Sequence, residues 1–128
     1  MENETKGTQS IQGSCHCGQV VFKLSQSPKW LVECNCSICQ RLGALWGHLD
    51  QSLVTLPESN GATIEYCHGD KTIAFHSCQN CGCTTHWLSL KPEVSTRMAV
   101  NFHMCSASDR ARLKIRPFDG ANTWEFLD

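Results

Sequence analysis

The chain has 128 residues, a formal net charge of −1 with neutral histidines, and 41% hydrophobic against 18% charged residues. These values predict one globular domain and exclude a largely disordered chain. The sequence contains no run of about 18 apolar residues, the length needed to span a membrane. Its near-neutral charge disfavours general nucleic-acid binding. Residues 1–12 are polar and do not have the pattern of a signal peptide, so we expect a cytoplasmic protein.

The predicted elements are short strands separated by glycine, asparagine and proline. Residues 1–10 have no apolar period, so we expect a flexible leader before one domain at 11–128. Runs of β-favouring residues predict strands at 19–24, 44–49, 63–66, 72–76, 84–88 and 97–102, with a hairpin turn at 68–71. Short helical turns are expected only at 37–42 and 107–113. The predicted fold class is therefore β, a single small domain with few or no helices.

Cysteine is the most informative residue type in this chain. Seven of the ten cysteines form three tight clusters, which are Cys15 and Cys17, then Cys34, Cys36 and Cys39, and finally Cys78 and Cys81. Because a reducing cytoplasm keeps thiols from pairing, these clusters indicate metal ligands rather than disulfides.

The spacing suggests how the clusters pair. Four thiolates close a tetrahedral zinc site, whereas three leave one coordination position for water or substrate. Gly18 and Gly82 each follow a two-cysteine cluster, where glycine permits positive φ and lets backbone N–H groups approach the sulfurs. We therefore assign a structural zinc to Cys15, Cys17, Cys78 and Cys81. We assign a second, catalytic zinc with an open position to a tripod, defined as Cys34, Cys36 and Cys39.

The alternative is that the second site is also closed and purely structural. A fourth protein ligand would then complete the tripod, and the candidates are Cys83, Cys67 and His48.

At this point the chain resembles the glutathione-dependent formaldehyde-activating (GFA) family, which shares a superfamily with centromere protein V. The residues that carry the likeness are 13–18 with the strand that follows, 34–39 with 43–46, 75–82 and 118–124. The resemblance implies a zinc-containing β-tent-like fold with two zinc sites. It also implies a carbon–sulfur lyase that joins glutathione and formaldehyde as S-hydroxymethylglutathione.

On this hypothesis a substrate thiolate binds at the open position of the tripod zinc, beside an aldehyde. His48 is a candidate acid–base group, and Arg41 and, more weakly, Arg97 are candidate partners for substrate carboxylates. His76 and His86 flank the last cluster and could donate hydrogen bonds to its sulfurs.

Two other functions stay open. One is a non-catalytic, zinc-stapled interaction module, although the mildly acidic leader offers no basic arm for it. The other is a thiol-based redox or metal sensor that uses Cys83 and the tripod. Basic and apolar residues alternate over 110–116, which on a strand would give one basic face, typically solvated. We expect no nucleic-acid or membrane partner and leave a homodimer open.

Overall fold

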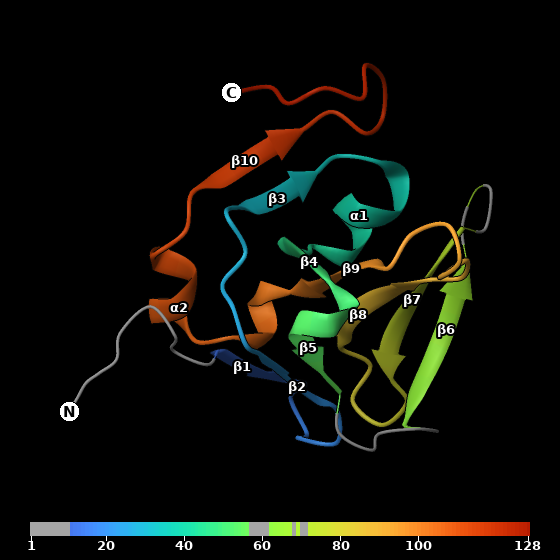
Figure 1. Cartoon of the computed structure of the whole chain (residues 1–128), viewed down its shortest axis with the longest axis vertical. Coiled ribbons are helices and arrows are strands. Elements are labelled where there is room, and N and C mark those ends of the chain that lie inside the picture. Colours follow the sequence, from blue (N-terminus) through green and yellow to red (C-terminus); the bar gives the residue numbers. More distant parts are fainter. Residues whose placement is uncertain (1–10, 57–61, 68, 70–71) are drawn as a thin grey trace.

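The computed structural model describes residues 11–56, 62–67, 69 and 72–128, and in these residues ten short strands form two sheets (Figure 1). The expected leader and most of the expected turn at 68–71 lie outside the described residues. The smaller sheet has the strand order β1-β2-β5. Its strands are β1 (Ile11–Ser14), β2 (Val21–Leu24) and β5 (Val54–Thr55).

The larger sheet has seven strands in the order β10-β3-β4-β9-β8-β7-β6. They are β10 (Ile115–Phe118), β3 (Leu31–Cys34), β4 (Trp46–Asp50), β9 (Arg97–Asn101), β8 (Thr84–Ser89), β7 (Ile73–Cys78) and β6 (Thr63–Cys67). All neighbours in this sheet run antiparallel except β10 and β3, which are parallel. The last strand therefore lies beside the strand that ends at Cys34.

Helices are few and short, which confirms the predicted fold class. The helices in the described residues are α1 (Ser37–Leu42), α2 (Ala107–Ala111) and the single 3-10 turns η2 (Gln51–Leu53) and η3 (Phe102–Met104). Within the described ranges, every helix is too short to reach across a bilayer.

The helical turn expected at 107–113 is present as α2, so the first half of 110–116 is not part of a strand. Ser106 caps α2 by accepting a hydrogen bond from the Asp109 N–H at 3.1 Å, so the chain is helical up to Ala111. Extended structure begins only at Ile115, and the basic side chains of this segment do not share one strand face.

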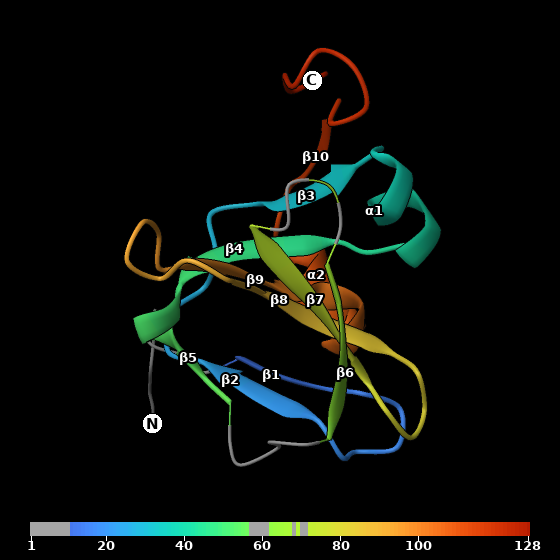
Figure 2. The ribbon, with the colours of Figure 1, turned by 90° about the vertical axis from the view of Figure 1, so that its right-hand side faces the viewer.

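The main core lies between the two sheets. Figure 2 shows β1, β2 and β5 on one side of β4, β9 and β8, with β3, β10 and α1 on the other. Phe22 and Leu24 of the smaller sheet pack with Met98 and Val100 of the larger one. A second cluster, on the α1 side, contains Val32, Cys39, Ala44, Trp46, Phe75 and Ala99. The helix that carries Cys39 and is capped by Cys36 is thus packed against this cluster.

Candidate metal centres

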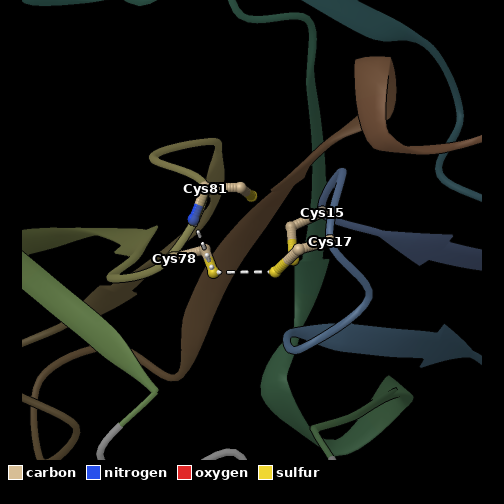
Figure 3. A group of neighbouring side chains, drawn as sticks. All are labelled: Cys15, Cys17, Cys78 and Cys81. Atoms are coloured by element: carbon tan, nitrogen blue, oxygen red, sulfur yellow. Dashed lines mark hydrogen bonds between the residues drawn. The ribbon is translucent and has the colours of Figure 1, made fainter.

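Four cysteines from two distant loops come together (Figure 3). Cys15 and Cys17 follow β1, Cys78 ends β7, and Cys81 lies in the β7–β8 turn. All four sulfurs lie within 4.8 Å of one another, with Cys15 and Cys17 at 3.7 Å and Cys17 and Cys78 at 3.6 Å. Zinc–sulfur bonds of about 2.3 Å place the corners of a tetrahedron about 3.8 Å apart. The spacing therefore fits one ion held by four sulfurs, in the predicted pairing.

Backbone groups of the two loops donate hydrogen bonds to these sulfurs. Gly18 and Gly82 have φ of 86° and 83°, as the sequence predicts. The N–H groups of Val20 and Asn80 donate to the sulfurs of Cys15 and Cys78 at 3.2 and 3.4 Å. Backbone hydrogen bonds lower the pKa of Cys81 to about 5, and the one from Cys83 has the largest effect. Deprotonated sulfur is the form that binds a metal ion.

The tripod comes from one short segment. Cys34 ends β3, Cys36 is the N-cap of α1, and Cys39 lies in the first turn of that helix. The Cys36 sulfur accepts the Cys39 N–H at 3.5 Å, so a ligand also acts as the helix cap. The three sulfurs lie within 4.8 Å of one another and could hold one ion.

Hydrogen bonds among the tripod cysteines shift the pKa values of Cys34 and Cys39 in opposite directions. A side-chain hydrogen bond with Cys39 is the main cause that lowers the pKa of Cys34 to about 5, while the same pairing raises that of Cys39. The buried Cys39 sulfur also accepts the indole N–H of Trp46 at 3.3 Å, which stabilises its charged form. One tripod sulfur is thus a thiolate at neutral pH, and a bound cation would deprotonate the others.

No fourth cysteine, histidine or carboxylate of the described chain completes the tripod. Cys83 packs beside the four-cysteine cluster, and Cys67 is on β6 opposite Ala74. The His48 ring packs edge-on against Trp87, with ring centroids 5.6 Å apart. The three candidates for a capping ligand therefore lie elsewhere.

A cavity of about 300 Å³ lies beside the tripod and is lined by Cys34 and Cys39. Its other lining residues are Glu33, Asn35, Gln40, Gly43, Ala44, His103, Pro117, Phe118 and Leu127. A small ligand in this cavity would touch two of the three sulfur-bearing residues. Sequence reasoning missed most of these residues, and only the likeness over 118–124 pointed to the C-terminal wall.

The loop after β10 closes over the tripod. The side-chain Nδ2 of Asn35 donates to the Asp119 carboxylate at 3.0 Å, and the side-chain Oδ1 of Asn35 accepts the Ala121 N–H at 3.0 Å. Thr123 donates to the same carboxylate through its backbone N–H and its hydroxyl. These bonds hold Gly120 against Cys34, where its N–H hydrogen-bonds the sulfur.

The predicted substrate-binding residues lie outside this cavity. Arg41 donates to the Ser37 carbonyl at 2.8 Å and is exposed, whereas Arg97 lines a separate cavity of about 230 Å³ beside Trp87. Burial, and then the charge of Arg97, lowers the pKa of His48 to about 4, so this imidazole is neutral at physiological pH.

His76 and His86 form a buried stacked pair, with ring centroids 4.7 Å apart. Their Nδ1 atoms hydrogen-bond Thr63 and Thr85 at 2.9 and 2.8 Å. The Nδ1 atoms of both histidines therefore bond to threonine hydroxyls and not to the cysteine sulfurs.

Fold and site together define a small two-sheet β protein with two cysteine clusters that could each hold a metal ion. The family model described as glutathione-dependent formaldehyde-activating enzyme matches residues 10–118, so the chain belongs to this GFA family. The crystal structure of a Rhodobacter sphaeroides protein is similar in fold, with a TM-score of 0.66 and 24% identity, over 82% of this chain and 99% of that one. No curated protein matched the chain.

Proposed function

We propose that this protein is a zinc-dependent enzyme or carrier of the carbon–sulfur lyase type, acting on adducts of a small thiol and formaldehyde. The observation that carries the proposal is the tripod, which has three converging sulfurs, no fourth described protein ligand and a cavity beside it. Membership of the GFA family supports the same reaction class. Carrier and catalyst share this site, because thiols add to formaldehyde readily without help.

In this proposal the two clusters have different tasks. Cys15, Cys17, Cys78 and Cys81 hold a structural ion, because four sulfurs leave no position for a substrate. Cys34, Cys36 and Cys39 hold the catalytic one. A zinc ion there would supply a coordination position at which a substrate thiol loses its proton.

The surrounding side chains position the reactants. The apolar wall that Phe118 and Leu127 contribute limits the cavity to a small molecule, and His103 is a lining group that could exchange a proton with it. In the joining direction the sulfur–carbon bond forms while the carbonyl π bond breaks, and the thiol proton ends on the new hydroxyl. Proximity is the main benefit that such a cavity offers, since it replaces a bimolecular encounter.

The test is X-ray absorption at the zinc edge on metal-replete protein. Without substrate, we expect seven sulfur ligands in total around the two zinc ions, all from cysteine. Addition of glutathione or another small thiol is expected to raise this number to eight. NMR with ¹³C-formaldehyde then measures the rate at which the S-hydroxymethyl adduct forms or breaks.

Two variants serve as controls. Cys36→Ser is expected to lose the response to thiols, whereas Cys67→Ser, at a cysteine outside both clusters, is expected to keep it. Unchanged zinc coordination with every thiol would overturn the proposal in favour of a metal-stapled scaffold.

A further inference from the structure

We propose that the cavity beside the tripod selects small thiols with a neutral or cationic group and disfavours thiols that carry carboxylates, glutathione included. This inference rests on the proposed function, since it concerns which thiol reaches the tripod.

The charge of the site is the first argument. Three thiolates on a divalent cation sum to −3 + 2 = −1. Glu33, next to Cys34, places a carboxylate in the wall of the same cavity. A second carboxylate brought in by a substrate would therefore meet like charge on two sides.

The lack of an available cation is the second argument. Among the described residues that line the cavity there is no lysine or arginine. The nearby Arg116 is bound to Asp128 through Nε at 2.9 Å and Nη2 at 3.2 Å, and stacks over the rings of Trp30 and Phe126. Lys114 lies 3.4 Å from the same carboxylate. Both cations thus contact the Asp128 carboxylate, and neither lines the cavity.

The remaining lining is suited to a small, uncharged or positive group. Asn35 and Gln40 offer amide groups, and Ala44, Pro117 and Phe118 offer apolar surface. The volume of about 300 Å³ is at the lower end of ligand cavities, which favours a compact thiol.

The experiment measures thiol binding to Co²⁺-loaded protein through the sulfur-to-metal absorption bands. The probes are 2-mercaptoethylamine, 2-mercaptoethanol and 3-mercaptopropionate, which are similar in size and carry positive, zero and negative charge. Titrations are made at about pH 8, where histidine side chains are mostly neutral. Because the probes differ in thiol acidity, the readout is the change in each affinity between wild type and variant.

Glu33→Gln is expected to weaken the cationic thiol about threefold and to strengthen the anionic one about threefold, as exposed charge pairs do. Gln40→Lys, at an exposed helix position, is expected to shift the ratio further toward the anionic thiol and glutathione. The matched control is Glu93→Gln, at an exposed loop position outside the lining, which should change none of the affinities.

The outcomes separate the two proposals. If thiols bind but Glu33→Gln leaves the ratio of their affinities unchanged, the selectivity is wrong and the proposed function stands. If no thiol changes the absorption bands of the wild type, both proposals fail.

Discussion

Gly120 lies so close to Cys34 that a Cβ atom at position 120 would be 2.5 Å from the Cys34 sulfur. Because the loop around Gly120 is tied to Asn35 through Asp119, it cannot simply move away. We expect Gly120→Ala to weaken metal binding at the tripod about 10- to 100-fold, the usual effect of disturbing the groups around metal ligands.

Metal analysis after dialysis checks this prediction: the variant should keep one ion per chain where the wild type keeps two. Gly69→Ala is the control for a glycine substitution as such, because an added Cβ there would meet no atom within 4 Å, and its positive φ adds strain only away from the tripod. Two ions retained by Gly120→Ala would contradict the expected clash.

The two clusters should differ in their effect on stability. Cys17 and Cys78 are 61 positions apart, so an ion between them joins distant parts of the fold, whereas the tripod spans only positions 34–39. We expect Cys17→Ser to lower the melting temperature by about 10 °C and Cys36→Ser to lower it by only a few degrees. Calorimetry with and without a chelator measures both, and equal losses would argue against this division.

The indole of Trp46 should tune the tripod. Trp46→Phe keeps the ring in the core but removes the N–H that donates to the Cys39 sulfur. We expect metal affinity at the tripod to fall about tenfold, because a thiolate that loses a donor becomes harder to form. Competition with a chromophoric chelator gives the affinity, and Trp87→Phe is the control. Equal affinities would mean that the contact does not stabilise the thiolate.

Stability should fall in mild acid because of buried neutral histidines. Burial lowers the pKa of His48 to about 4 and that of His86 to about 3, while an unfolded histidine titrates near about 6.5. Between these values the unfolded chain binds more protons, so the stability present above pH of about 6.5 is lost as pH falls.

Removing one such group should flatten this dependence. We expect His48→Gln to reduce the slope of unfolding free energy by about 1.4 kcal/mol per pH unit between pH about 6 and about 4.5. Denaturant titrations of the wild type and of His48→Gln at several pH values measure the slope. Equal slopes for the two proteins would contradict this prediction.

Local chemistry made part of this structure predictable. The pairing of cysteine clusters follows from ligand count and from the glycines after Cys17 and Cys81, and the observed sulfurs have that grouping. The helix at 37–42 was also expected with its observed bounds, and four β runs between 63 and 102 occur where β-favouring residues predicted them.

Long-range pairing could not be predicted in the same way. The strand Ile115–Phe118 contains a proline, and its parallel register with Leu31–Cys34 depends on residues far apart in the chain. As a result the sequence did not predict that His103 and Leu127 line the cavity. Nearness in sequence was also a poor guide to binding groups, since Arg41 turns back to the Ser37 carbonyl.

The contact between Asn35 and Asp119 joins positions 84 residues apart, which has a consequence for biosynthesis. The three tripod cysteines leave the ribosome long before the segment that covers them, so they are uncovered in the nascent chain. Metal can be delivered at that stage without displacing any covering loop. Completion of the C-terminal strand then closes the wall around an ion already in place.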